Sequence, residues 1–305
     1  MRVFVTGASG WIGSAVVPEL TSAGHQVVGL ARSDASAAAL TAAGVEVQIG
    51  TLDDLDTLRG VADKSDAVIH LAFKHDLVYS GDFQGAAEAD RRAVEAFGEV
   101  LAGTDRPFVI ASGTLGLTQG VLATEADGHG PVDVRGSGPS VRRATAEFAL
   151  SLANDGVRAS VVRLPPTVHG DGDNGFMTLI VGAARKTGVS AYIGDGTNRW
   201  PAAHRLDVAH LFRLALEKAP AGSTLHAIAD EGVPIRQIAE VIGQHLNVRV
   251  ASITAEEADE QFGVLAHLLA LDSPASSTLT CELLGWVPTH QGLIADLEEG
   301  HYFNR

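Results

Sequence analysis

The sequence predicts an α/β protein built on a doubly wound parallel sheet, with a smaller lobe at the C-terminal end. Two observations carry this prediction. Strand-like and helix-like segments alternate along the first 164 residues, and a glycine-rich segment, TGASGWIG, stands between the first strand and the first helix. Strands that alternate with helices pair in parallel through right-handed crossovers, which cover both faces of the sheet.

The elements of the first half follow from two sequence periods. Short runs of apolar and β-branched residues predict buried strands, and apolar residues at helical spacing predict the helices between them. The strands are expected at residues 1–6, 25–31, 45–49, 66–72, 107–112 and 158–164. The helices are expected at residues 11–23, 34–43, 54–63, 84–103 and 139–154.

The glycine-rich segment at residues 6–13 predicts a phosphate-binding turn. Gly7 permits a tight turn out of the strand, Gly10 lets backbone amides approach a phosphate, and Gly13 lets the helix pack closely against the strand. The phosphates would then meet free N–H groups at the positive end of the helix dipole. Because the segment lies between a strand and a helix, it predicts a Rossmann-type fold that binds a nicotinamide dinucleotide.

The character of the sequence changes after Leu164. Residues 165–175 and 191–201 are rich in proline, glycine and polar residues, so we expect no regular element in either stretch. A helix near 207–218, a strand near 224–228, a helix near 234–245 and a mainly helical tail over 255–305 follow. We therefore expect a dinucleotide-binding domain over residues 1–164, with a return excursion near 202–230, and mainly a substrate-binding lobe over 165–305.

Composition excludes several classes of protein. The chain has 305 residues and a formal net charge of −15, and no cluster of lysine and arginine offers a path for a nucleic-acid backbone. No apolar run approaches the roughly 18 residues of a membrane span. Cys281 is the only cysteine and no signal-peptide pattern is present, so we expect a cytoplasmic protein that acts on a small molecule. Metal-binding spacings such as HExxH are absent, and we expect no metal site.

The end of the second strand bears on the choice of dinucleotide. NAD-binding units usually carry an acidic residue here that accepts from the ribose 2′-hydroxyl. In this chain that position is Ala31, and Arg32 and Ser33 follow, which could bind a 2′-phosphate. We therefore expect NADP rather than NAD. In the alternative, Arg32 is a solvated loop residue and Asp34 takes the role of the acid.

At this point the chain resembles the extended short-chain dehydrogenase/reductase superfamily, also described as NAD-dependent epimerases and dehydratases. The resemblance covers nearly the whole chain, and it is carried by TGASGWIG, DAVIHLA, FVIASGT, VVRLPPTVHG, IGDGTNRWPAAHRLDVA and LGWVPT. It implies cofactor contacts at Gly7, Ser9, Gly10, Trp11, Ile12, Gly13, Arg32, Ser33, Leu52, Leu71, Ala72, Lys74, Arg143, Pro165 and Val168.

The chain departs from the superfamily at its catalytic pair. Members normally use Tyr-x-x-x-Lys on the helix after the fifth strand, and no tyrosine of this chain is followed by a lysine at that spacing. When the family's glutamate is placed on Glu147, the lysine position falls on Arg143 and the tyrosine position on Pro139. The chain therefore resembles the atypical branch of the superfamily, although it also lacks the His-x-x-x-Arg pair of that branch.

Four residues are candidates for the remaining chemistry. Ser112 and Thr114 flank the superfamily's serine/threonine position and end a strand at the ligand crevice; alternatively they cap local backbone. Arg143 can stabilise developing negative charge on an oxygen but cannot donate a proton at neutral pH. His75, which follows HLA and Lys74 in the loop after the fourth strand, titrates near neutrality and is a candidate proton donor.

Other aromatic and ionisable residues have two interpretations each. His169, His204 and Asp207 form either an acid–base group or charges that support folding, and the second interpretation is favoured for Asp207. Tyr192 and Trp200 form either a wall for an apolar substrate or ordinary core, and the core is favoured.

The leading hypothesis is an NADP-dependent oxidoreductase that moves a hydride between the nicotinamide and a small carbonyl, alcohol or imine. The loss of the tyrosine and lysine motivates an alternative, a cofactor-binding sensor or regulator with little turnover. A third hypothesis is an epimerase or lyase that uses the nicotinamide transiently. The resemblance also suggests a homodimer through the helices near 84–103 and 139–154, the second of which carries an apolar stripe.

Overall fold

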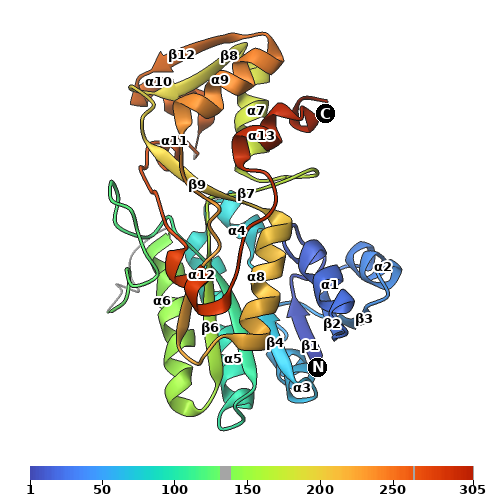
Figure 1. Ribbon diagram of the computed structural model, residues 1–305. Coiled ribbons are helices and arrows are strands. Elements are labelled where there is room, and N and C mark those ends of the chain that lie inside the picture. The colour runs from blue at the N-terminus through green and yellow to red at the C-terminus, as the bar shows by residue number, and fades with distance from the viewer. Residues whose placement is uncertain (131–138, 264, 305) are drawn as a thin grey trace.

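The computed structural model describes residues 1–130, 139–263 and 265–304. The chain forms two lobes, a larger one that contains the N-terminus and a smaller one that contains the C-terminus (Figure 1). No helix of the described residues is both long and apolar enough to span a bilayer.

The larger lobe is organised around a parallel sheet, which has seven strands in the part of the chain that the structure describes. The strand order is β10-β6-β5-β4-β1-β2-β3, and every neighbouring pair is parallel. This order confirms the predicted doubly wound sheet, whose direction of winding reverses between β1 and β4. The strands are β1 (Arg2–Thr6), β2 (Gln26–Ala31), β3 (Glu46–Ile49), β4 (Ala67–His70), β5 (Pro107–Gly113), β6 (Arg158–Leu164) and β10 (Ser223–His226).

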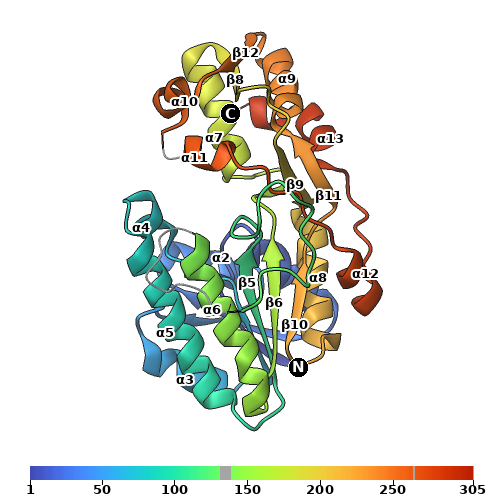
Figure 2. The same ribbon diagram turned by 90° about the vertical axis from the view of Figure 1, so that its left-hand side faces the viewer.

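Helices cover both faces of this sheet (Figure 2). One face packs against α1 (Gly13–Ser22), α2 (Asp34–Ala42) and α8 (Arg205–Lys218). The other face packs against α3 (Leu55–Asp63), α5 (Phe83–Leu101) and α6 (Pro139–Ser151), and α6 continues into the short helix η1 (Leu152–Asp155). The alternation along β1 explains the two layers, because Val3 and Val5 enter the first core and Phe4 enters the second.

The smaller lobe has two small sheets and its own core around Trp200. One sheet has the order β11-β9-β7, and in the other β12 pairs in parallel with β8. The strands are β7 (Thr167–His169), β8 (Val189–Ile193), β9 (Arg199–His204), β11 (Asp230–Pro234) and β12 (Arg249–Ile253). The remaining helices of the second half are α7 (Phe176–Thr187), α9 (Ile235–Leu246), α10 (Ala255–Phe262), α11 (Leu265–Leu269), α12 (Thr278–Leu284), α13 (Leu293–Glu298) and η2 (His301–Phe303). The first half adds one short helix after β4, which is α4 (His75–Tyr79).

The prediction of two irregular stretches was wrong in part. Within 165–175, the three residues of β7 pair in parallel with β9, and β8 and β9 extend into 191–201 from either side. A strand as short as β7 leaves no period in the sequence, and its partner residues lie 35 positions further along the chain. The helix α7 was not predicted, although its buried residues Met177, Ile180, Val181 and Ala184 follow helical spacing and Gly188 ends it in the left-handed conformation.

The second half of the chain returns to the large lobe, as the predicted excursion requires. The helix α8 packs on the sheet and β10 adds a strand beside β6, whereas β9 belongs to the smaller lobe. Further along, α12 packs on α8 and β10, and Trp286 is fully buried in the core beneath them. The division of the chain into two domains stays a prediction, since this core draws on both halves of the sequence.

Candidate dinucleotide and active site

The turn after β1 requires glycine at two positions. Gly7 adopts a φ of +69°, and a Cβ on this residue would lie 2.8 Å from the backbone nitrogen of Ala72. A Cβ on Gly13 would lie 2.1 Å from the carbonyl oxygen of Gly7 and 2.7 Å from that of Ala8. Because these neighbours are backbone atoms, α1 reaches this close to the end of β1 only with glycine at position 13.

The start of α1 fits a phosphate group. The N-cap residue, Ile12, provides no side-chain cap, and among the hydrogen bonds of the described residues none uses the N–H groups of Trp11 and Ile12. These donors lie at the positive end of the helix, next to the glycine turn. The turn and the helix terminus together fit the pyrophosphate of a dinucleotide. Ser9 and Gly10 are exposed on the same turn, and Gly10 closes it by donating to the carbonyl oxygen of Gly7 at 2.9 Å.

A buried polar chain supports this turn from below. The Oγ1 of Thr6 lies 2.7 Å from Nδ1 of His70, and Nε2 of His70 lies 3.1 Å from a carboxylate oxygen of Asp90 on α5. The backbone N–H of Ala72 donates to the Thr6 hydroxyl at 3.3 Å. These hydrogen bonds therefore fix the loop after β4 to the end of β1. The sequence contained His70 in the motif DAVIHLA, but nothing in its spacing indicated its two partners.

The predicted adenosine-side residues lie at the ends of β2 to β4. Arg32 is exposed and lies 3.7 Å from Asp76, at the start of α4. The Ser33 hydroxyl accepts from the backbone N–H of Ser36 at 3.3 Å and caps α2, so this side chain already has a structural role. Leu52 is buried in the core, whereas Leu71 and Ala72 are half-buried beside Gly7. Lys74 forms an ion pair with Asp53 and is not among the described residues that line the pocket.

A large pocket lies between the lobes, above the carboxyl ends of β4, β5 and β6. Its volume is about 780 Å³. Of the residues predicted from the sequence, those that line it are Trp11, Ile12, His75, Ser112, Thr114, Pro165 and Val168. The indole N–H of Trp11 donates to the carbonyl oxygen of Val168 at 2.8 Å, which joins the glycine turn to β7 of the smaller lobe. Ser112 and Thr114 are buried, and the Thr114 hydroxyl donates to the carbonyl oxygen of Leu164 at 3.4 Å.

The basic residue that α6 contributes to this pocket is Arg142. Its Nη2 donates to the carbonyl oxygen of Ala111 at 3.4 Å, and its guanidinium lies 4.5 Å from the centre of the Phe73 ring. Burial lowers the pKa of Arg142 and the charge of Asp90 opposes this shift, but a guanidinium stays protonated in proteins. The sequence register pointed instead to Arg143.

Arg143 is not among the described residues that line the pocket. Its charge, together with burial, lowers the pKa of Arg163 on β6, so it lies on the side of α6 that faces this strand. On the same side, Glu147 lies 3.9 Å from Arg163 and 3.2 Å from His129. The cofactor contact expected for Arg143 stays a prediction, and the geometry offers Arg142 as a second candidate.

His75 lies at the mouth of the pocket, and its ring packs against that of Phe73 at 5.4 Å between centroids. Burial of the ring by its surroundings, followed by the charge of Arg142, lowers the pKa of His75. The lowered pKa favours the uncharged imidazole at neutral pH, a form better suited to accept a proton than to donate one.

The sequence analysis missed a second ionisable residue of the pocket, Asp173. Its carboxylate accepts from the Tyr302 hydroxyl at 3.0 Å and from the backbone N–H of Gly175 at 2.6 Å. Burial raises the pKa of Asp173, although these two hydrogen bonds oppose the shift. The residue lies in the segment GDGDNG, where an acid among glycines was the available signal.

The residues His169, His204 and Asp207 lie outside the pocket lining. The Asp207 carboxylate accepts from the backbone N–H groups of Thr289 and His290, both at 3.0 Å, and lies 2.7 Å from Nδ1 of His290. It therefore fastens the segment after Trp286 to the start of α8. This contact set supports the structural interpretation of Asp207.

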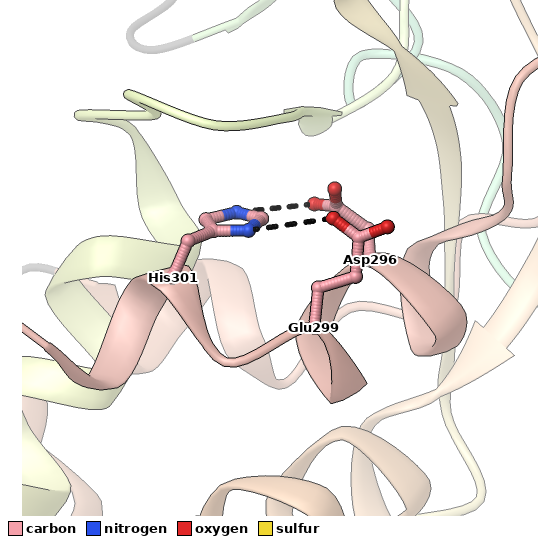
Figure 3. Close-up of side chains that lie close together, drawn as sticks. All are labelled: Asp296, Glu299 and His301. Carbon is pink, nitrogen blue, oxygen red and sulfur yellow. Dashed lines mark ion pairs between the residues drawn. The ribbon is translucent and has the colours of Figure 1, made fainter.

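One trio among the described residues could hold a metal ion, and Figure 3 shows it as Asp296, Glu299 and His301. Nε2 of His301 lies 3.6 Å from Asp296, whereas Nδ1 lies 3.9 Å from Glu299. The two carboxylates thus face opposite nitrogens of one ring, which is the arrangement of a histidine flanked by ion pairs rather than of ligands converging on one ion. The absence of a metal stays a prediction.

Beside the site, His226 is held as a neutral imidazole, and this predicts a loss of stability in acid. Nδ1 lies 2.8 Å from the carbonyl oxygen of Ser276, and Nε2 lies 3.4 Å from Nη1 of Arg163. Burial lowers the pKa of His226 to about 4 from an ordinary value of 6.5. The unfolded chain therefore takes up the proton first, and the free energy of unfolding falls by about 3 kcal/mol as the pH drops from 6.5 to 4.

The replacement His226→Gln isolates this contribution, because glutamine can donate to Ser276 and accept from Arg163 without titrating. Urea unfolding at several pH values should show a shallower loss in the variant between pH 6.5 and 4. The exposed His245 is the control, and His245→Gln should keep the slope of the unmodified protein. Equal slopes for His226→Gln and the unmodified protein would contradict the assignment.

Comparison with known proteins places this arrangement among its relatives. The sequence model of the NAD dependent epimerase/dehydratase family matches residues 3–228. The chain is 50% identical over 304 residues to "Uncharacterized protein C2A9.02" of Schizosaccharomyces pombe, which covers 99% of this chain and 100% of the relative. It is 27% identical over 245 residues to a decarboxylating sterol-4-alpha-carboxylate 3-dehydrogenase of Dictyostelium discoideum, covering 77% of this chain and 74% of the relative. A solved structure of UDP-glucose 4-epimerase from Thermotoga maritima, with UDP-glucose, has a TM-score of 0.78 at 18% identity and covers 99% of this chain and 98% of that one.

Proposed function

Because this chain belongs to the NAD dependent epimerase/dehydratase family and is an NAD(P)-dependent oxidoreductase, we propose that it uses NADP to interconvert a carbonyl or imine and the corresponding alcohol or amine. The reaction proceeds at a site without the Tyr-x-x-x-Lys pair. The observation that carries this proposal is the placement of a charged residue, Arg142, in the pocket beside the end of β5 and the glycine turn.

The residues of the larger lobe hold the cofactor. Backbone amides at the start of α1 would bind the pyrophosphate, and the glycines of the turn would leave room for it. When bound, a nicotinamide supplies or removes two electrons as a hydride. The hydrogen bond from Trp11 to Val168 joins the turn to the smaller lobe beside the pocket.

The chemistry at the substrate oxygen depends on Arg142 and Ser112. A fixed guanidinium in a pocket of low polarity stabilises the negative charge that develops on this oxygen, and the buried Ser112 hydroxyl can donate to it. Arg142 cannot release a proton, so the proton is exchanged with His75 or with water at the mouth of the pocket. Since His75 is neutral at pH 7, it accepts a proton when an alcohol is oxidised.

The choice of NADP rests on Arg32, and its replacement by alanine should reverse the preference between cofactors. A 2′-phosphate would draw the exposed Arg32 side chain away from its ion pair with Asp76, which is separated by 3.7 Å. A hydrogen bond to a charged group is worth about 1.5–3 kcal/mol, so Arg32→Ala should weaken NADPH binding by at least tenfold and leave NADH binding unchanged. Fluorescence titration with both reduced cofactors measures this. The control is Arg236→Ala, an exposed arginine of the smaller lobe.

The same protein preparation tests turnover. Oxidation of NADPH by a panel of aldehydes, ketones and imines, followed by absorbance, is the expected result. Tighter binding of NADH than of NADPH by the unmodified protein would contradict the cofactor assignment. Tight NADPH binding without turnover of any substrate would favour the sensor or regulator instead.

A further inference from the structure

The walls of the pocket are mostly apolar on both lobes, and Asp173, Gln261 and His267 are among the polar residues that the smaller lobe adds to them. Phe73, Val78 and Phe83 come from the loop after β4, α4 and the start of α5. The smaller lobe contributes Phe176 and Leu179 from α7, and also Leu268 of α11. The volume of about 780 Å³ is lined in part by Trp11, Ile12, Pro165 and Val168, the predicted cofactor contacts, so the cofactor and the ligand would share it. A small hydrophilic substrate would gain no binding energy from contact with such walls.

Polar groups gather at the floor of the pocket, where the strands end. Arg142 and the buried hydroxyls of Ser112 and Thr114 belong to the ends of α6 and β5. The Nε of Arg142 is buried and has no hydrogen-bond partner among the described residues, and none of their carboxylates forms an ion pair with its guanidinium. A buried guanidinium with an unsatisfied donor favours a ligand oxygen at this position.

The charge of the lining also bears on the ligand. Among its described residues Arg142 is the one arginine, no lysine contributes, and the buried acid Asp173 lies on the same wall as Phe176. A nucleoside diphosphate carries two phosphate groups and needs several donors of positive charge. These residues therefore fit a neutral ligand with a single polar end better than a nucleotide sugar.

We propose that the substrate is a ketone or aldehyde with a bulky apolar body, that Arg142 donates to its carbonyl oxygen, and that Phe176, Leu179 and Leu268 enclose the apolar body. This inference rests on the proposed function and names the substrate class of the same site. Because the polar groups lie at the floor of the pocket and the apolar residues on its walls, the carbonyl of the ligand points toward the cofactor side.

A series of straight-chain 2-alkanones, from 2-butanone to 2-undecanone, tests the apolar body. With NADPH, kcat/KM should rise about threefold to fourfold for each added methylene until the pocket is filled, the factor that burial of a CH₂ group gives. Calorimetric titration of the protein with the same ketones in the presence of NADP⁺ measures their affinity without turnover. The affinity should rise along the series as well.

Two pairs of variants assign the roles. Leu179 is 45% exposed, so Leu179→Glu should leave the fold intact, which thermal melting checks, while the preference for long ketones falls at least tenfold. Leu283, 50% exposed and outside the pocket, is the matched control as Leu283→Glu. Arg142→Met should lower kcat for short and long ketones by the same factor, about a hundredfold, and keep the long-to-short ratio. Arg142→Lys should recover part of that loss.

The outcomes separate this inference from the proposed function. If affinity rises with chain length but no ketone is reduced, the substrate class stands and the oxidoreductase proposal fails. If ketones are reduced at rates that do not depend on chain length, the inference is overturned and the proposed function stands. Tighter binding of UDP than of 2-undecanone, or no binding of any ketone, also overturns it.

Discussion

Replacing Gly13 with alanine is expected to abolish dinucleotide binding and to lower the thermal stability of the protein. The new Cβ would lie 2.1 Å from the carbonyl oxygen of Gly7 and 2.7 Å from that of Ala8. Both are backbone atoms, so α1 must move away from β1, at a cost of about 1–3 kcal/mol or more. The N–H groups of Trp11 and Ile12, which the proposed function assigns to the pyrophosphate, would move with the helix. Fluorescence titration with NADPH should show at least a hundredfold loss of affinity, and thermal melting a lower midpoint.

Gly60 provides a matched control for this experiment. It lies in α3, and a Cβ added to it would have no atom within 4 Å. Alanine is favoured over glycine inside a helix by about 1 kcal/mol, so Gly60→Ala should keep NADPH binding and slightly raise stability. An unchanged affinity in Gly13→Ala would show that the turn does not hold the cofactor.

Replacing Asp207 with alanine is expected to destabilise the protein by about 3 kcal/mol while leaving NADPH affinity unchanged under native conditions. The carboxylate is 3% exposed and accepts from the backbone N–H groups of Thr289 and His290. Its removal leaves these donors without a partner and releases the segment that follows Trp286. Urea unfolding followed by circular dichroism measures the loss.

The exposed Asp63 at the end of α3 supplies the comparison, and Asp63→Ala should change stability by less than about 0.5 kcal/mol. Full stability of Asp207→Ala, combined with a loss of turnover, would contradict the structural role. It would restore the interpretation of His204 and Asp207 as an acid–base group.

The fold of the larger lobe was predictable because its turn and its strands require particular residue types. Only glycine fits between α1 and the end of β1, so Gly7 and Gly13 mark the turn without reference to the rest of the fold. The inner strands of the parallel sheet are buried on both faces, so apolar runs such as RVFVT in β1 identify them. The predicted sheet and its neighbouring helices were confirmed for these reasons.

The smaller lobe was less predictable because its contacts join distant segments. The strand β7 depends on β9, and β8 depends on β12, some 60 residues further along the chain. The three residues of β7 are too few for a sequence period to develop.

The residues of the candidate site were likewise predictable only in part. Trp11, Ser112 and Thr114 could be placed in the crevice because they end strands or follow the glycine turn. The choice between Arg142 and Arg143 could not, because neighbouring positions on a helix differ by about 100° and the motif that fixes the register is missing. The homodimer, the cytoplasmic location and the small-molecule partner stay predictions.

The path of the chain through the two lobes has a consequence for its modularity. After β6 the chain enters the smaller lobe, returns through α8 and β10, and returns once more through α12 and Trp286 (Figure 1). A fragment that ended at Leu164 would lack the helix, the edge strand and the tryptophan that cover one face of its sheet. The dinucleotide-binding half therefore does not form a self-contained unit: its apolar face is completed by α8, α12 and Trp286 from the second half of the chain, and neither lobe can be exchanged as one contiguous stretch.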